Sequence, residues 1–237
     1  MANTKHFDRY LTTARFTDPR DPEASRRFYD TEYAPYLPAD KKAAVLDVGC
    51  GMGEFMAYLA DKGYENVCGV DVSPEMADHC RQNGIANVEL IKDLKEYLAR
   101  YAASFDLITL NDTLEHLPKG DTVDILKGLK AALKTGGALL LRTVNFSTPG
   151  GMYIRYKDFT HEIAYTECSL EQVLRMAGFE DIKVTGNRYP VRFSAVSLAR
   201  AALLRIWFFI LKMIYLAELG CDRPKIYSKI LIAVCRN

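Results

Sequence analysis

The sequence lacks several features that would each indicate a class of protein. Its 237 residues carry 31 basic and 30 acidic side chains, a net charge of +1, so we expect no nucleic-acid partner. The six cysteines form no C-x-x-C pair, which favours buried apolar thiols in a reducing compartment. The first residues are polar and do not resemble a secretory signal. A spanning helix needs about 20 mostly uncharged residues, whereas Arg205 and Lys212 interrupt the most apolar stretch, 201–219.

What the chain does have is a strand, a glycine-rich turn and a helix start between residues 43 and 55. Residues 43–48 are apolar apart from Asp47, as expected of a strand covered on both faces. Gly49, Gly51 and Gly53 follow at every second position, which lets the backbone turn sharply and approach a ligand closely. The spacing matches neither G-x-G-x-x-G nor a P-loop. Asp47 beside the turn argues against a phosphate ligand, because two anions repel.

A second acidic residue ends the next expected strand, residues 66–70. Asp71 precedes Ser73 and Pro74, which suit the N-cap and the first position of a helix. Open α/β sheets bind ligands at the carboxyl ends of their strands, so Asp71 is placed to accept two ribose hydroxyls. A third expected strand, residues 88–91, is followed by Asp93, which either meets a ligand or caps the helix that follows.

These motifs together resemble the class I S-adenosylmethionine-dependent methyltransferases. The resemblance implies a doubly wound α/β fold with a mostly parallel seven-stranded sheet, strand order 3-2-1-4-5-7-6, and a helical insertion between the last two strands. It implies S-adenosylmethionine as the cofactor, its amino-acid end at the glycine turn and its adenine near Asp93. The implied cofactor-binding residues are Asp47, Gly49, Gly51, Gly53, Asp71, Val72, Met76, Asp93, Leu94, Asn111, Tyr29 and Tyr33.

The fourth expected strand, residues 105–110, leads into a corner with metal-ligand chemistry. If residues 112–117 form a helical turn, Asp112, Glu115 and His116 share one face and could hold a divalent metal or place one imidazole over the substrate. The pattern resembles the metal-bearing corner of quinone-biosynthesis O-methyltransferases. The alternative is that this segment only closes the strand–helix corner.

A polar segment at residues 153–166 follows the fifth expected strand, 138–144, and a loop, 145–151. A mere linker of this length between core elements would be unusual. The segment resembles one in bacterial methyltransferases encoded with O-antigen assembly enzymes, where it lies over the active site. It makes His161 the first candidate for general base, with Asp158 or Glu162 as its orienting carboxylate, unless His161 is only a surface residue. Arg155, Tyr156, Asp158 and Glu162 are the implied substrate-binding residues. A capping box of Ser169 and Gln172 is expected to begin the next helix.

The expected organisation is one core with additions at both ends. The segments are an N-terminal helical cap (1–42), the cofactor-binding core (43–189), an apolar helical insertion (190–224) and a final core strand (225–237). In the cap, residues 23–36 are expected to be helical, with Tyr29 and Tyr33 either packed on the sheet or closing over the cofactor. The helix at 201–219 has three interpretations: a membrane-surface helix, a homodimer contact, or a helix buried on the domain.

The resemblance implies transfer of a methyl group to a hydroxyl. The first interpretation of the acceptor is a sugar hydroxyl of a bacterial surface glycan or its lipid-linked precursor. The alternative enzyme acts on a quinone or another small phenolic metabolite. A third interpretation, of another class, is a non-catalytic cofactor-binding module of a glycan-assembly complex. The expected location is the cytoplasm, at the inner face of the membrane.

Overall fold

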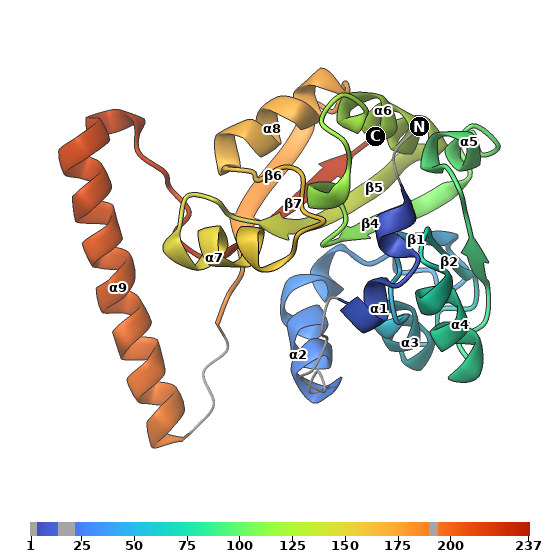
Figure 1. Ribbon diagram of the computed structural model, residues 1–237, viewed down its shortest axis with the longest axis horizontal. Coiled ribbons are helices and arrows are strands. Elements are labelled where there is room, and N and C mark those ends of the chain that lie inside the picture. Colours follow the sequence, from blue (N-terminus) through green and yellow to red (C-terminus); the bar gives the residue numbers. More distant parts are fainter. Residues whose placement is uncertain (1–3, 14–21, 190–193) are drawn as a thin grey trace.

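The chain folds around a twisted seven-stranded sheet with helices on both faces (Figure 1). The computed structural model describes residues 4–13, 22–189 and 194–237. The strand order, β3-β2-β1-β4-β5-β7-β6, confirms the predicted fold class. The strands are β1 (Val45–Val48), β2 (Val67–Asp71), β3 (Val88–Leu90), β4 (Phe105–Asn111), β5 (Leu133–Val144), β6 (Asp181–Gly186) and β7 (Ile230–Arg236).

The pairing of the strands gathers their ends at one edge. The first five strands are parallel, with Asp47 of β1 opposite Gly69 of β2 and Thr109 of β4. Strand β7 runs antiparallel between β5 and β6. The carboxyl ends of β1, β2, β3, β4 and β5 therefore lie side by side, where open α/β sheets bind ligands.

Two of the helices, one near the N-terminus and one after β5, were not expected, and the others differ from the expected ones mainly at their ends. They are α1 (Tyr10–Thr13), α2 (Pro22–Glu32), α3 (Glu54–Asp61), α4 (Pro74–Gln82), α5 (Leu94–Leu98), α6 (Thr122–Ala132), α7 (Pro149–Lys157), α8 (Glu167–Met176) and α9 (Ala195–Leu219), with 3₁₀ turns η1 (Thr4–Phe7), η2 (Ala34–Tyr36), η3 (Leu114–His116) and η4 (Gly220–Asp222). The helix expected at 23–36 is thus divided into α2 and η2.

Helices α8 and α7 begin at positions where no helix start was expected. Helix α8 begins earlier than expected, because Thr166 caps it and forms the capping box with Ser169, so Ser169 is the third helical residue rather than the cap. Helix α7 starts inside the segment expected to be a loop, because Thr148 caps it by accepting from the Gly151 N–H at 3.1 Å, with Pro149 at its first position.

The core lies on both faces of the sheet. On one face, Leu126 and Leu129 of α6 and Leu170 of α8 pack with the side chains of β4 and β5. On the other, the aromatic rings of Tyr29 and Tyr33 pack with those of the α3 residues, among them Phe55. Tyr29 of α2 and Tyr33, which follows α2, are 4% and 0% exposed, so the expectation that they pack on the sheet is confirmed.

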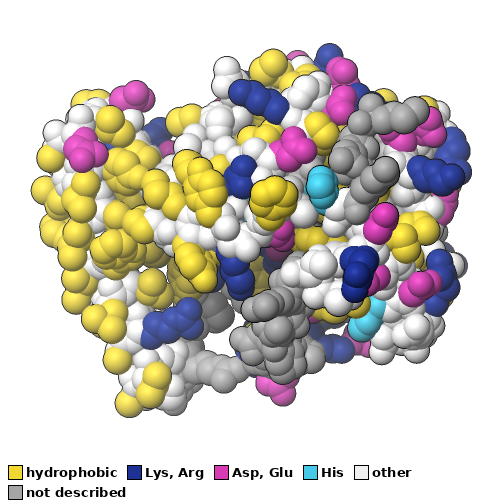
Figure 2. Space-filling view, viewed as in Figure 1, with side chains coloured by type: hydrophobic (Ala, Val, Ile, Leu, Met, Phe, Trp, Pro, Cys, Tyr) yellow, Lys and Arg dark blue, Asp and Glu magenta, His cyan; other side chains and the backbone are white. Residues whose placement is uncertain are grey.

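Helix α9 stands to one side of the sheet and of the helices that cover its two faces (Figure 1). Leu211 is its only buried side chain among those described, whereas Leu203 is 66% exposed and Phe209 is 62% exposed. Apolar side chains cover the α9 surface in the space-filling view (Figure 2). The interpretation of this segment as a helix buried on the domain was therefore wrong. Within the described ranges, no helix meets the length and apolarity that a membrane span requires.

Candidate active site

The glycine turn lies at the carboxyl end of β1. Gly49, Gly51 and Gly53 all have positive φ, +67°, +54° and +76°. A Cβ on Gly49 would lie 2.3 Å from the Thr113 hydroxyl oxygen, whereas a Cβ on Gly51 would meet nothing within 4 Å. Gly49 is thus required for packing against the β4 corner, while Gly51 faces open space where a ligand can approach the backbone.

Asp47 is the buried acid of this turn. One of its carboxylate oxygens accepts from the Thr109 hydroxyl at 2.6 Å and from the Asn111 amide at 3.4 Å. The Asn111 carbonyl in turn accepts from the Tyr33 hydroxyl. Burial raises the pKa of Asp47 to about 7. A positive charge beside this carboxyl would favour its ionised form, and the α-amino group of a bound ligand could supply that charge.

Asp71 holds the turn in place from β2. Its two carboxylate oxygens accept from the backbone N–H groups of Gly51 and Ser73, each at 2.8 Å. Burial raises the pKa of Asp71. The Ser73 hydroxyl is buried without a hydrogen-bond partner, although Ser73 stands at the N-cap of α4. An unpartnered hydroxyl beside the open face of Gly51 fits a polar ligand at the ends of β1 and β2. Met76, one turn into α4, is buried and Val72 is partly buried.

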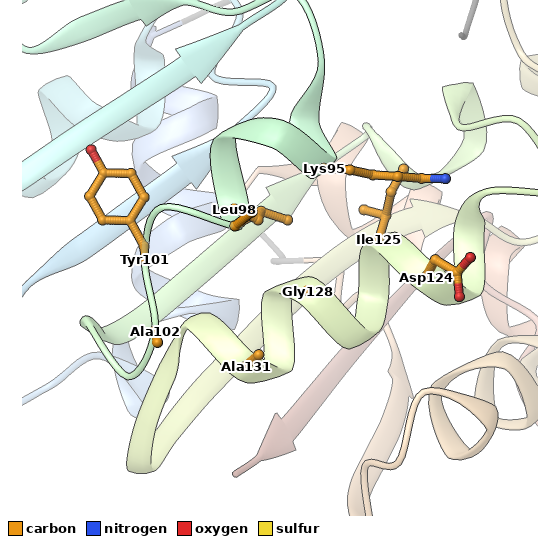
Figure 3. A pocket seen from close by; sticks show the side chains of 9 residues that line it. Lys95, Leu98, Tyr101, Ala102, Asp124, Ile125, Gly128 and Ala131 are labelled. Atoms are coloured by element: carbon orange, nitrogen blue, oxygen red, sulfur yellow. The ribbon is translucent and has the colours of Figure 1, made fainter.

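Asp93 caps helix α5. One of its carboxylate oxygens accepts from the backbone N–H groups of Lys95 at 2.7 Å and Glu96 at 3.1 Å, so the helix-capping interpretation is confirmed. Leu94 beside it is partly buried. A pocket of about 240 Å³ lies between α5 and α6, and its lining includes Leu98 of α5 and Ile125 of α6 (Figure 3). None of its lining residues is a predicted site residue, so this pocket is separate from the strand edge described above.

The corner after β4 does not bring Asp112, Glu115 and His116 onto one face. Asp112 has φ +51°, and the turn that follows is a short 3₁₀ turn beginning at Leu114. Asp112 pairs with Arg142 of β5, and Glu115 accepts from the Thr143 hydroxyl at 2.9 Å. His116 instead contacts the segment after α7. The three side chains therefore have three different partners, and the predicted metal set does not converge.

The segment after α7 is fixed to this corner through both backbone and side chains. The backbone N–H groups of Glu162 and Ile163 donate to the Glu115 carbonyl at 2.8 and 3.1 Å. This brings the His161 ring to 4.6 Å from the His116 ring, measured between centroids. The structure thus brings together two histidines that are 45 positions apart by number.

The prediction that Asp158 or Glu162 forms the orienting hydrogen bond to His161 was wrong. The Nδ1 of His161 lies 3.2 Å from the Arg155 carbonyl oxygen. Asp158 is connected to the other histidine: the Thr160 hydroxyl lies 2.7 Å from an Asp158 oxygen and 2.9 Å from Nδ1 of His116. The Glu162 side chain is exposed, and so is Tyr156, at 77%. Arg155 donates to the Glu162 carbonyl at 3.0 Å.

Burial disfavours the charged form of both imidazoles. Burial, together with the nearby His161, lowers the pKa of His116 to about 4. Burial also lowers the pKa of His161. Side-chain N and O atoms of His116, His161 and Asp158 all lie within 4.8 Å of one another. These three side chains, and not the predicted set of Asp112, Glu115 and His116, form the polar cluster at this corner.

Residues 4–13, here called the strap, were not predicted to take part in the site. The Tyr10 hydroxyl donates to Asp158 at 2.6 Å, and the rings of Phe7 and Tyr10 lie 5.7 and 5.8 Å from that of His116. At its far end, the backbone N–H and hydroxyl of Thr12 donate to Glu75 of α4 at 3.0 and 2.7 Å. The strap therefore connects the polar segment after β5 with the helix after β2. The only sequence signal was the aromatic pair Phe7 and Tyr10 in a polar stretch.

Comparison with known proteins identifies the family. A family model described as a methyltransferase domain matches residues 23–184. Over 167 residues, the chain is 31% identical to a ubiquinone biosynthesis O-methyltransferase of Xanthomonas axonopodis pv. citri, covering 62% of this chain and 66% of the relative. Over 179 residues, it is 32% identical to a protein of the same name from Xylella fastidiosa strain M23, covering 67% of this chain and 70% of the relative. The aligned part therefore spans slightly less than two thirds of the Xanthomonas protein.

Solved structures agree on the fold. A SAM-dependent methyltransferase from Archaeoglobus fulgidus superposes with a TM-score of 0.68 at 20% identity, covering 91% of this chain and 94% of that one. A Haemonchus contortus phosphoethanolamine N-methyltransferase, solved with S-adenosylhomocysteine, has a TM-score of 0.57 at 20% identity, covering 86% of this chain and 51% of that one. The chain belongs to the class I S-adenosylmethionine-dependent methyltransferases.

Proposed function

We propose that this protein methylates a hydroxyl group of a quinone precursor or another small phenolic molecule. The observation that carries the proposal is the pair of adjacent imidazoles, His116 and His161, with the aromatic rings of Phe7 and Tyr10 beside that of His116. Aromatic side chains beside the His116 imidazole suit a flat aromatic acceptor, because ring–ring contacts are favourable. The similarity to ubiquinone biosynthesis O-methyltransferases supports the same acceptor class.

The residues of the chain have three tasks in this reaction. The glycine turn, Asp47 and Asp71 hold the cofactor, and the corner after β4 orients the acceptor. S-Adenosylmethionine, when bound, supplies the methyl group. In that complex the acceptor oxygen would bond to the methyl carbon while the carbon–sulfur bond breaks and its electron pair stays on sulfur. One imidazole accepts the hydroxyl proton as the carbon–oxygen bond forms, since a neutral imidazole has the free lone pair this requires.

A glycan acceptor is the second candidate. Tyr153, Tyr156 and Phe159 are 69%, 77% and 92% exposed around the end of α7, and exposed rings of this kind can stack on sugars. The third interpretation, a non-catalytic module of a glycan-assembly complex, keeps the cofactor site but needs no base.

An acceptor screen with cofactor labelled in its methyl group separates these three functions. The acceptors are catechols and hydroxylated quinone precursors, sugar nucleotides, and lipid-linked glycans. We expect label in the phenolic products. Replacing by alanine whichever of His116 and His161 accepts the proton should lower turnover by about 10²–10⁴-fold. Label only in the sugar acceptors would make the glycan function correct. Tight cofactor binding with no transfer to any acceptor would support the non-catalytic module.

We further propose that α9 rests on the cytoplasmic face of an anionic membrane. Exposed apolar side chains surround this helix, and its charges are Arg200, Arg205 and Lys212 against Glu218. An apolar helix with excess positive charge binds anionic lipid headgroups through burial and charge together. A homodimer that covers the same helix is the competing interpretation.

Vesicle binding tests the placement of α9. The protein should co-sediment with phosphatidylglycerol vesicles, and the fluorescence of Trp207, which is 42% exposed, should shift to the blue. Neutral phosphatidylcholine vesicles are the control and should bind more weakly. A protein that ignores both vesicle types and sediments as a concentration-independent dimer would support the homodimer instead.

A further inference from the structure

A continuous chain of hydrogen bonds runs from the strap to the histidine of the β4 corner. The Tyr10 hydroxyl donates to one oxygen of Asp158 at 2.6 Å. The other Asp158 oxygen accepts from the Thr160 backbone N–H at 2.9 Å and lies 2.7 Å from the Thr160 hydroxyl. That hydroxyl lies 2.9 Å from Nδ1 of His116. The chain of hydrogen bonds thus joins three segments, the strap, the residues after α7 and the β4 corner, and ends at one ring nitrogen of His116.

The donors in this chain can be assigned from chemistry alone. An ionised carboxylate only accepts, so the single proton of the Thr160 hydroxyl goes to Asp158. The hydroxyl oxygen is then left as an acceptor, and His116 must donate to it from Nδ1. The ring nitrogen on the opposite side, Nε2, carries the lone pair. Asp158 is ionised in this setting: although burial opposes it, the hydrogen bonds from Tyr10 and Thr160 hold its pKa below the ordinary value.

We propose that Thr160 and Asp158 are positioning residues that fix His116 in the tautomer with a free Nε2, which makes His116 the base of the methyl transfer. Asp158 acts through the Thr160 hydroxyl, as the orienting carboxylate acts directly in a serine–histidine–aspartate triad. Tyr10 holds the second oxygen of the carboxylate and closes the chain from the strap. The proposal rests on the proposed function and specifies which of the two histidines accepts the proton.

His161 has a different environment. Its Nδ1 faces the Arg155 backbone carbonyl, and no carboxylate is among its hydrogen-bond partners in the described part of the chain. This carbonyl fixes the tautomer of His161 without a hydroxyl–carboxylate relay, so we assign His161 to orienting the acceptor and not to accepting the proton. Its ring lies beside that of His116, where it orients the acceptor.

The hydrogen bonds also argue against a metal ion in the cluster of His116, Asp158 and His161. The two Asp158 oxygens already receive three hydrogen bonds, and the Thr160 hydroxyl stands between Asp158 and His116. An ion bound by both groups at about 2.0–2.2 Å would have to displace Thr160 from this position.

The experiment compares Thr160→Val with Thr160→Ser. Valine has nearly the shape of threonine but lacks the hydroxyl, whereas serine keeps the hydroxyl. We expect Thr160→Val to lower kcat by about 10–100-fold, the usual effect of removing an outer partner of a functional histidine. The KM for the cofactor should not change, and Thr160→Ser should recover most of the activity. A Thr160→Val protein with wild-type kcat, or a Ser variant as slow as the Val variant, would overturn the proposal.

A second measurement works without any turnover. Nitrogen-15 NMR of the histidine rings reports which nitrogen carries the proton. We expect the Nδ1–H tautomer for His116 in the wild type and in Thr160→Ser, and a mixture of tautomers in Thr160→Val. If no acceptor is ever methylated but these tautomers are observed, the proposed function fails while the hydrogen-bond chain stands. An Nε2–H tautomer for His116 in the wild type, or stoichiometric Zn²⁺ binding that Asp158→Asn abolishes, would overturn the positioning role.

Discussion

Asp47 couples the stability of the protein to pH. Its pKa is about 7 in the folded chain against an ordinary value of 3.8, because the carboxyl is buried. The folded state therefore holds the proton more tightly than the unfolded state. The contribution of this group to stability is complete below pH 4 and is lost as the pH rises toward 7. Above that range, a negative charge remains buried with the hydrogen bonds from Thr109 and Asn111 to stabilise it, and in the proposed cofactor placement an ammonium group would add a positive charge beside it.

We therefore predict that Asp47→Asn makes the cofactor-free protein more stable at pH 8, by on the order of a few kcal/mol. At pH 5 the gain should be smaller. Cofactor affinity should fall, because the amide carries no charge. Urea unfolding of both proteins at the two pH values measures the first effect, and calorimetry measures the second. A variant that loses stability at pH 8 would contradict the prediction.

Gly51 has a natural control in Gly63. Both have positive φ, +54° and +83°, and a Cβ on either would meet nothing within 4 Å. An alanine should cost each about 1–2 kcal/mol of unfolding free energy, through the same left-handed backbone strain. Only Gly51→Ala should also weaken S-adenosylmethionine binding, by tenfold or more, since only Gly51 stands in the turn beside Asp47 and Asp71. Equal cofactor affinities in the two variants would place the cofactor elsewhere.

Some residues of the candidate site could be predicted from the sequence, and others could not. The acids and glycines of the turn were predictable, because their positions follow from a strand pattern and a short spacing. The partner of Asp158 was not, since the choice between His161 and His116 depends on how the segment after α7 docks on Glu115. Asp71 shows a further limit: because it accepts from Gly51 and Ser73, replacing it by alanine should disturb the turn as well as the ligand contact.

Among the elements, the strap is the least predictable and the most testable. Thr12 fixes it to Glu75, whereas the hydroxyl of the neighbouring Thr13 donates to the Arg9 carbonyl within the strap itself. Thr12→Val should therefore loosen the strap and speed the dissociation of S-adenosylhomocysteine several-fold, while Thr13→Val should not. Stopped-flow dissociation rates measure this. Identical rates in the two variants would show that the strap does not control access.

The elements of the sheet were predictable for a different reason than the strap. Apolar runs such as those of β1 and β4 have the period and length of buried strands, and strand order followed from the family resemblance. The strap and α7 carry no such periodicity. Their positions are set by a few long-range hydrogen bonds, such as that between Tyr10 and Asp158, which no local pattern encodes.

For the molecule as a whole, the sheet with its two helical layers is held by buried apolar side chains, whereas α9 is mostly exposed. Leu203 and Phe209 are mostly exposed, so replacing both by glutamine should change the unfolding free energy by less than about 1 kcal/mol. Leu141→Ala in the sheet core should cost about 2–5 kcal/mol. The double variant should also lose its binding to anionic vesicles. Unfolding of the double variant in the absence of lipid would mean that α9 packs on the domain.

The strand order has a consequence for synthesis on the ribosome. Strand β6 forms its sheet pairs with β7, which follows it in the chain by more than forty positions. β6 must therefore wait, unpaired, until α9 and then residues 230–236 have left the exit tunnel. During that interval the nascent chain presents a bare edge of β5 and an apolar helix together, the combination that chaperones bind. If α9 binds an anionic membrane as proposed, a bilayer close to the ribosome would cover this helix before the sheet closes.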